Sequence, residues 1–317
     1  MRHLLCCALL ISSCLAQTLN PSNTSPSSEK QDKQEKQKVL WQKLESNIYD
    51  VDHNLDGVMG VAIEDLTTGD QFFLHENEVF AQASSIKIAV LAELYRQAQE
   101  GKLKLTDLYT VQVSDLVPDS NIMGGLTPGV TRITLRDLAT MMVAVSDNSA
   151  TNVLIDRVGM DNVNAFLAAQ GPRDTRLRRK MMDLKAAAEG RENVSTPNEM
   201  SKLLEALYRG QILNKEMTDA FFSMLATHKH GFLSLDLPEG LKIANKPGEL
   251  EGVRNDSAVV FVENRPYVIC VMTTYLHRER DGEEAIAKIS AAAYRMFDRL
   301  ARASEYGRVV SPGNSSK

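Results

Sequence analysis

A serine and a lysine stand three residues apart in the segment Ser84-Ser85-Ile86-Lys87. This spacing places both side chains on one face of a helix that we expect to begin near Ser85 and to end at Gly101. A serine hydroxyl is a weak nucleophile until a base accepts its proton, and a desolvated lysine can be that base. The pattern also has a plainer explanation, a helix cap followed by a surface charge, and Ser27-Ser28-Glu29-Lys30 matches it equally well.

Two further segments place polar residues at the ends of apolar elements. Ser146-Asp147-Asn148 follows the apolar stretch 138–145, where it would otherwise read as a capped helix boundary. A Lys-x-Gly pattern occurs twice, as Lys229-His230-Gly231 and as Lys246-Pro247-Gly248. The second follows the strand-like residues 241–245, and its other interpretation is a hairpin turn made by proline and glycine.

In this order, the motifs S-x-x-K, S-D-N and K-x-G resemble the penicilloyl-serine family, and most closely the class A β-lactamases. The likeness runs from about residue 40 to residue 301 and includes Ser195-Thr196-Pro197 and the segment Gly252-Val253-Arg254-Asn255-Asp256. The resemblance implies an α+β fold of the β-lactamase/transpeptidase type. In that fold an antiparallel sheet is flanked by helices, a helical subdomain is added, and the site lies between the two parts.

The resemblance also implies roles for individual residues. Ser84 would be the acylated nucleophile, Lys87 its general base, and Ser146 the group that passes the proton to the leaving nitrogen. The other implied roles are substrate-amide binding by Asn148, positive charge from Lys246, substrate binding along Gly248 and Glu249, an oxyanion hole from the N–H groups of Ser84 and Glu249, and carboxylate binding by Arg254. The alternative for Arg254 is an ordinary surface charge near a turn.

The chain departs from the family pattern at two positions. Family members carry a glutamate that activates the water for deacylation, and this sequence aligns Met181 with it. A thioether cannot accept a proton from water at neutral pH, so the acyl-enzyme should persist unless Asp183 or Glu192 substitutes. Pro247 replaces the usual hydroxyl residue of the third motif, which removes one hydrogen-bond donor.

These features predict a class A β-lactamase-type serine hydrolase that opens β-lactam amides through an acyl-serine. The alternative is a D-alanyl-D-alanine peptidase, or a penicillin-binding sensor module that is acylated and deacylates slowly. The expected partner is therefore a β-lactam or a D-Ala-D-Ala-type peptide. We expect no cofactor.

The elements that must position these residues can be read from the pattern. Strands are expected at 58–65 and 71–74, and again at 241–244, 257–262 and 267–275, with a last helix over 283–301. Thr134 and Thr196 are predicted helix caps, the second followed by a proline at the first helical position. Strands at both ends of the chain predict one antiparallel sheet, with the helical part at about 85–235.

The N-terminus has the layout of an export signal. An apolar run over 4–11 is too short to span a bilayer and is followed by small residues, so we expect a signal peptide over 1–16, or a lipoprotein signal cleaved before Cys14. The predicted domains are then a flexible linker over 17–39, a catalytic domain over 40–306 and a disordered tail over 307–317. The predicted protein is periplasmic or secreted, with a lipid anchor at Cys14 as an alternative, no transmembrane span in the mature chain, and a monomeric state.

Composition limits the other classes of function. The 317 residues carry a net charge of −5, which disfavours nucleic acid as a partner because a duplex binder needs a basic surface. Cys270 is the one cysteine outside the signal, and it is predicted to be a core residue of a strand. The six histidines form no metal-ligand spacing, so no metal is expected.

Overall fold

The computed structural model describes residues 26–309, with side chains from residue 31 onward. In chain order, the elements are α1 (Pro26–His53), β1 (Val58–Asp65), β2 (Gln71–Leu74), β3 (Phe80–Ala81), the 3₁₀ helix η1 (Ala83–Ile86), α2 (Lys87–Gln99), β4 (Leu108–Thr110), η2 (Val113–Asp115), η3 (Met123–Gly125), β5 (Arg132–Thr134), α3 (Leu135–Ala144), α4 (Asn148–Val158), α5 (Met160–Ala169), α6 (Leu184–Ala188), β6 (Val194–Ser195), α7 (Pro197–Tyr208), α8 (Lys215–Leu225), η4 (Phe232–Ser234), β7 (Ile243–Leu250), β8 (Val253–Val260), β9 (Tyr267–Thr274) and α9 (Glu279–Arg302). In this part of the chain, no helix is both long enough and apolar enough to cross a bilayer.

Strands from both ends of the chain form one five-stranded sheet. Its order is β2-β1-β9-β8-β7, and every neighbouring pair is antiparallel. The first strand and the last pair directly, with Val61 opposite Val271. The prediction that the two ends meet in an antiparallel sheet is confirmed, and β7 forms one edge of it.

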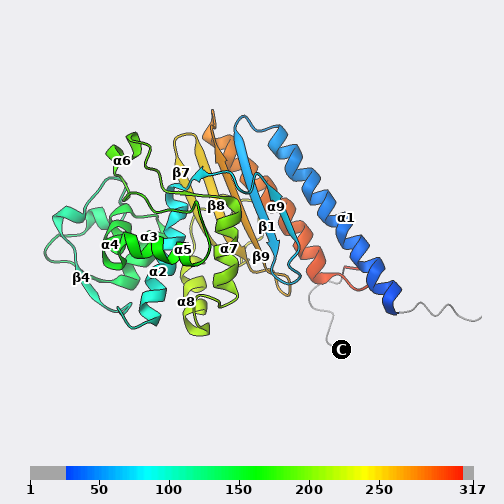
Figure 1. The fold of residues 1–317 in the computed structure, drawn as a ribbon, viewed down its shortest axis with the longest axis horizontal. Helices are drawn as coiled ribbons and strands as arrows, with labels where there is room; N and C mark the ends of the chain where they lie inside the picture. Colours follow the sequence, from blue (N-terminus) through cyan, green and yellow to red (C-terminus); the bar gives the residue numbers. More distant parts are fainter. Residues whose placement is uncertain (1–25, 310–317) are drawn as a thin grey trace, which may run out of the picture.

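Two long helices, α1 and α9, lie side by side along one face of the sheet (Figure 1). Their apolar residues form a buried cluster with alternate residues of β1, β8 and β9. At its centre the Phe297 ring stacks on Tyr267 at 4.1 Å and meets Trp41 edge to face at 5.7 Å. Aromatic pairs of these geometries add to the stabilisation that burial already gives.

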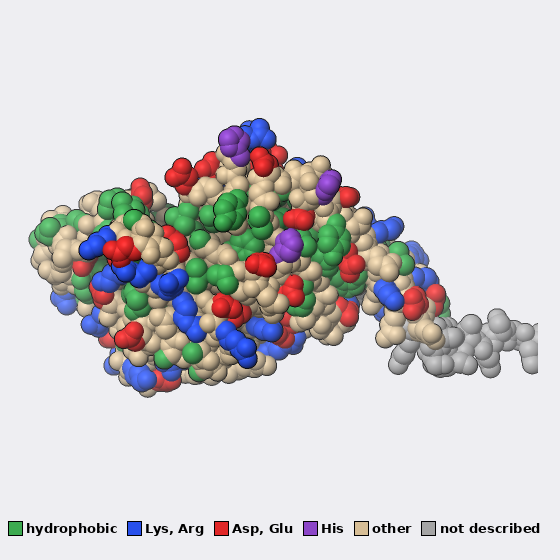
Figure 2. Space-filling model, turned by 45° about the horizontal axis from the view of Figure 1, so that its top comes forward, with side chains coloured by type: hydrophobic (Ala, Val, Ile, Leu, Met, Phe, Trp, Pro, Cys, Tyr) green, Lys and Arg blue, Asp and Glu red, His purple; other side chains and the backbone are tan. Residues whose placement is uncertain are grey.

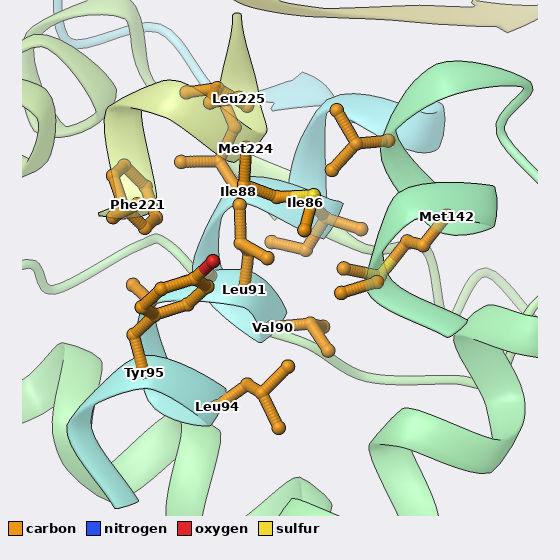
Figure 3. Close-up of a cluster of buried hydrophobic side chains, with 14 of the residues drawn as sticks. Ile86, Ile88, Val90, Leu91, Leu94, Tyr95, Met142, Phe221, Met224 and Leu225 are labelled. Atoms are coloured by element: carbon orange, nitrogen blue, oxygen red, sulfur yellow. The ribbon is translucent and has the colours of Figure 1, made fainter. Parts of the chain in front are cut away.

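The opposite face of the sheet supports α7 and α8, and the helical subdomain lies beyond them (Figure 1). Helix α2 runs through the middle of this second core. Figure 3 shows Ile88, Leu91 and Tyr95 from α2 pointing toward Phe221 and Leu225 of α8. A helix that is buried almost all round, as α2 is, is held by its neighbours, so the residues at its start keep a fixed position.

The predicted helix caps are confirmed. The hydroxyl of Thr134 accepts a hydrogen bond from the Asp137 N–H, and that of Thr196 accepts one from the Glu199 N–H. Pro197 occupies the first turn of α7. Cys270 is fully buried in β9, as predicted.

Three boundary predictions are wrong in part. Residues 26–39 belong to α1 and not to a flexible linker. After its first residues the segment holds neither glycine nor proline and consists mostly of good helix formers, with a Lys36–Asp32 pair one turn apart. At the other end, residues 307–309 fold back through a bridge between Ala303 and Val309 and are not part of a disordered tail. The third is β7, which continues to Leu250, so Lys246 lies within a strand and not beside a turn.

The predicted signal peptide, Cys14 and the rest of the tail lie outside the described residues. On the face shown in Figure 2, positively and negatively charged side chains are interspersed and do not form separate fields.

Candidate active site

The nucleophile candidate Ser84 lies in η1, immediately before α2 begins at Lys87. The residue before it, Ala83, has a φ of 47°, a left-handed conformation that non-glycine residues rarely adopt. This turn leads the chain from β3 into the buried α2. Ser84 therefore sits at the tip of a rigid helix, as the sequence predicts for the S-x-x-K motif.

Ser146 links Ser84 to Lys87. Its Oγ lies 2.9 Å from Ser84 Oγ and 3.0 Å from Lys87 Nζ. Ser146 has a φ of 57°, and the next residue, Asp147, caps α4 with its carboxylate. Two segments that are about 60 residues apart in the sequence thus form a continuous hydrogen-bonded chain of three groups.

The amine of Lys87 is enclosed by three acceptor-capable groups. Besides Ser146 Oγ, Nζ donates to Ser146 O at 2.7 Å and to Asn148 Oδ1 at 3.0 Å. Burial lowers the Lys87 pKa well below its usual value; the positive charge of Lys246 adds to this and Asp147 opposes it. A neutral amine has two N–H donors and one lone pair, so the two carbonyl oxygens can take the donors and leave the lone pair for Ser146.

Strand β7 is pressed against η1 on the other side of Ser84. A Cβ on Gly248 would lie 2.6 Å from the backbone oxygen of Gln82 and 2.9 Å from the N–H nitrogen of Ser85, so only glycine fits there. Ser85 Oγ donates to Lys246 O at 2.9 Å, which joins the two segments. A proline is tolerated next to this contact because β7 is an edge strand.

The side chain of Lys246 is buried with a network of polar groups from β7 and β8. Burial lowers its pKa to about 7, Asp256 opposes this shift, and Lys229 increases it. Asp256 is itself fully buried and accepts hydrogen bonds from the Asn245 amide and from Leu233 N–H. Burial raises the Asp256 pKa to about 6, and these hydrogen bonds and the two lysines counteract that rise.

A cavity of about 650 Å³ opens over these groups. Its walls come from η1, the end of α3, the loop before α6 and strand β7. They include Ser84, Ser146, Asn148, Lys246 and Glu249. Five of the residues that the sequence singled out therefore face one space, which is large enough for a small organic ligand.

Met181 also lies in the wall of this cavity and is only 7% exposed. Its backbone is fixed at both ends by one side chain, because Met181 N–H donates to Asn152 Oδ1 at 2.8 Å and Asn152 Nδ2 donates to Met181 O at 3.0 Å. Of the two substitute bases considered, Glu192 lines the cavity but is paired with Arg179 at 2.8 Å. Asp183 is exposed, lies outside the cavity wall and caps α6.

Arg254 is not among the cavity residues. Its Nε donates to Glu283 Oε1 at 2.9 Å, and one terminal nitrogen donates to two backbone carbonyls. The structure thus directs this guanidinium toward α9.

Sequence reasoning did not assign Lys229 or the Asn245–Asp256 pair to the site. The only available signal for Lys229 was that it belongs to the other Lys-x-Gly segment. Among the described residues, no group of three or more His, Cys, Asp or Glu residues is arranged to hold a metal.

Comparison with known proteins adds an independent result. The family model described as the beta-lactamase enzyme family matches residues 43–297. An imipenem-hydrolyzing beta-lactamase from Enterobacter cloacae is 29% identical over 261 residues, covering 80% of this chain and 88% of the relative. A beta-lactamase structure from Sphaerobacter thermophilus superposes with a TM-score of 0.74 and 32% identity, covering 80% and 97% of the two chains.

A mutant of PBP-A, solved as an acyl-enzyme complex with penicillin G, has the same fold at 24% identity, with a TM-score of 0.74 and coverage of 81% and 96%. The family match spans most of the chain, and the S-x-x-K, S-D-N and K-x-G segments meet around one cavity. The chain therefore belongs to the beta-lactamase enzyme family and is a class A β-lactamase-type serine hydrolase.

Proposed function

We propose that the protein opens β-lactam rings by transferring the acyl group to Ser84, and that hydrolysis of the resulting ester is its slow step. The observation that carries this proposal is the hydrogen-bonded chain from Ser84 Oγ through Ser146 Oγ to the buried Lys87 Nζ. It supplies a nucleophile, a proton path and a base whose pKa is lowered by burial.

The proton moves along this chain during acylation. Lys87 takes the Ser84 proton through Ser146 as the bond between Ser84 Oγ and the carbonyl carbon forms. The ring C–N bond then breaks, and the nitrogen receives that proton from Ser146. The N–H groups of Ser84 and Glu249 stabilise the oxyanion, since Gly248 lets β7 approach η1 closely.

Deacylation has no equivalent support, which favours a second candidate function. A thioether occupies the cavity wall at Met181, and of the two candidate bases Glu192 is held by Arg179 while Asp183 lies outside the cavity. A protein that is acylated and then trapped is a penicillin-binding sensor, or a D-alanyl-D-alanine peptidase that penicillins inhibit. The acyl-enzyme complex of the PBP-A mutant, a protein with this fold, supports this candidate.

A chromogenic cephalosporin and a fluorescent penicillin separate these functions. We expect a burst of one equivalent of product followed by slow steady turnover, and loss of fluorescent labelling in Ser84→Ala. Ser223→Ala, which removes an exposed hydroxyl from α8, is the matched control. Labelling that survives in Ser84→Ala would remove this serine from the mechanism. A burst without any turnover, together with release of D-alanine from an acyl-D-Ala-D-Ala peptide, would support the second function.

The two substitute bases are tested on the same acyl-enzyme. If Glu192 or Asp183 activates the water, Glu192→Gln or Asp183→Asn prolongs its lifetime, as followed by intact-protein mass spectrometry. Unchanged lifetimes in both variants exclude both residues.

We also propose export to the periplasm or the exterior, with cleavage after Ala16 or lipidation of Cys14 as the two alternatives. N-terminal sequencing of the mature protein, and metabolic labelling with a fatty acid, distinguish them.

A further inference from the structure

We propose that Arg254 is a positioning residue for acylation, which clamps the turn between β7 and β8 onto α9 and so keeps the Glu249 N–H aligned in the oxyanion hole. This inference rests on the proposed function, since it names the group that holds one of its oxyanion donors in place. It gives Arg254 a role other than the carboxylate binding that the family resemblance implies.

The guanidinium of Arg254 joins both sides of this turn to α9. One terminal nitrogen donates to Leu250 O at 2.9 Å and to Val253 O at 2.8 Å, the carbonyls of the last residue of β7 and the first residue of β8. Nε donates to Glu283 Oε1 on α9 at 2.9 Å. Two of the three guanidinium nitrogens are thus committed to the protein, and the side chain is only 14% exposed.

Groups near the start of α9 hold the same turn. Leu276 N–H donates to Gly252 O at 3.1 Å. Hydrogen bonds from the N–H groups of Glu279 itself and of Gly252 lower the pKa of the Glu279 carboxyl, so this carboxylate also lies at the turn. A Cβ on Gly282 would lie 3.2 Å from Arg254 Cβ, so glycine lets the first turn of α9 approach β8 closely. The position of the turn is therefore set by α9.

The pairing of β7 with β8 connects this turn to the site. Arg254 lies directly opposite Glu249 in the register of the two strands, and Glu249 lines the cavity. Earlier in β7, the hydrogen bond from Ser85 Oγ to Lys246 O joins the strand to η1. Glu249 thus lies between two anchors, one at η1 and one on α9. An oxyanion donor acts at about 2.7–3.1 Å from the oxyanion, so the alignment of the Glu249 N–H depends on both anchors.

Carboxylate binding and positioning predict opposite effects of Glu283. If Arg254 bound the substrate carboxylate, Glu283 would compete with the substrate, and its removal would speed the reaction of an acidic substrate. If Arg254 positions the turn, Glu283 is part of the clamp, and its removal slows the reaction. Arg254 is not among the described residues that line the cavity, whereas Leu250, whose carbonyl it holds, is one of them. These contacts favour the positioning role.

The first test compares one penicillin with its methyl ester, which has the same ring but no negative charge. In Arg254→Met the second-order rate of Ser84 acylation should fall by about 10- to 100-fold with both compounds, as when an oxyanion donor loses its alignment. Glu283→Met should also slow both reactions. The double variant should be no slower than Arg254→Met alone, because the two side chains act through one contact.

The matched control is Arg280→Met. Arg280 Nε donates to Glu284 Oε1 at 2.9 Å, so this substitution removes an ion pair of the same type from the same helix without touching the turn. Both acylation rates should stay at the wild-type value.

The second test uses phenylboronic acid, which has no carboxylate. Ser84 Oγ adds to boron, Lys87 takes the hydroxyl proton through Ser146, and a boron-bound oxygen of the tetrahedral adduct occupies the oxyanion hole. The affinity for this boronate should fall by about 10-fold or more in Arg254→Met and remain unchanged in Arg280→Met.

The outcomes separate this proposal from the proposed function. A loss with the acid alone, faster acylation by the acid in Glu283→Met, or an unchanged boronate affinity in Arg254→Met overturns the positioning role. If no penicillin acylates the wild-type protein but the boronate binds, the proposed function fails and the boronate affinities alone decide the role of Arg254. If neither reacts, both proposals fail. Thermal unfolding checks that the variants fold, and Glu283→Met tests the clamp even where Arg254→Met does not fold.

Discussion

Replacement of Met181 by glutamate should convert a long-lived acyl-enzyme into one that turns over. The Asn152 amide holds the backbone of residue 181 through both its N–H and its carbonyl, and these two hydrogen bonds do not involve the methionine side chain. A glutamate there would place a carboxylate in the wall of the cavity that contains Ser84. General-base catalysis contributes about 10²–10⁴-fold, which lowers the deacylation barrier by about 3–5 kcal/mol.

The assay measures the lifetime of the acyl-enzyme by mass spectrometry and the steady-state rate after the burst. Met181→Gln, which has a similar shape but no base, is the control and should keep the wild-type lifetime. A carboxylate at this 7%-exposed position is partly desolvated, so its pKa should rise and the gain should increase with pH toward neutrality. If Met181→Glu deacylates no faster than Met181→Gln, the missing base does not limit turnover and the reasoning fails.

Three other outcomes are expected. Lys87→Met should slow acylation by about 10²–10⁴-fold. Because burial lowers the Lys87 pKa, the acylation rate of the wild-type protein should reach its plateau well below pH 10.5, and a rate that still rises above pH 10 would contradict a neutral amine. Gly248→Ala should lower the free energy of unfolding in urea by about 1–3 kcal/mol and slow acylation, because its Cβ would meet the backbone of η1. Gly125→Ala, the control, has open space around it and should do neither; equal effects of the two substitutions would refute the contact. Glu64 is buried beside Glu205, and burial raises the pKa of Glu64 to about 7, so the free energy of unfolding of the wild-type protein should decline between about pH 4.5 and pH 7. Glu64→Gln should remove this decline, so that its free energy of unfolding minus that of the wild type is about 1–3 kcal/mol larger at pH 8 than at pH 5. A difference that does not change with pH would contradict this prediction.

Local signals in the sequence predicted the elements that carry the site. The caps at Thr134 and Thr196 act within one turn, and runs rich in Val, Ile and Phe mark the strands, so neither needs tertiary information. The resemblance carried by the three motifs implied that Ser84, Ser146 and Lys246 share a site, and they line one cavity.

The direction of individual side chains could not be predicted in the same way. Arg254 lies where the resemblance expects it in the sequence, yet its guanidinium finds Glu283 on α9, a contact between residues of two separate elements. Lys229 depends on a similar long-range fact, the approach of Gly231 to Asn245 and Asp256. Neither contact leaves a periodic or capping signal.

The geometry around Ser84 supports the acylation step of the proposed function. Ala83 and Ser146, on the two sides of the proton path, both adopt left-handed backbone conformations, which cost about 1–2 kcal/mol per non-glycine residue. One fully buried group anchors the segment next to Ser146: Asp147 accepts hydrogen bonds from the N–H groups of Ile122, Met123 and Ala150. At Met181, by contrast, Asn152 fixes a backbone that carries a thioether, which is not a base. Strain of this kind persists only where the surrounding structure over-determines it. Under the proposed function, formation of the acyl-serine is the step that this strain serves, and the lifetime of the ester is expected to depend on the side chain at position 181.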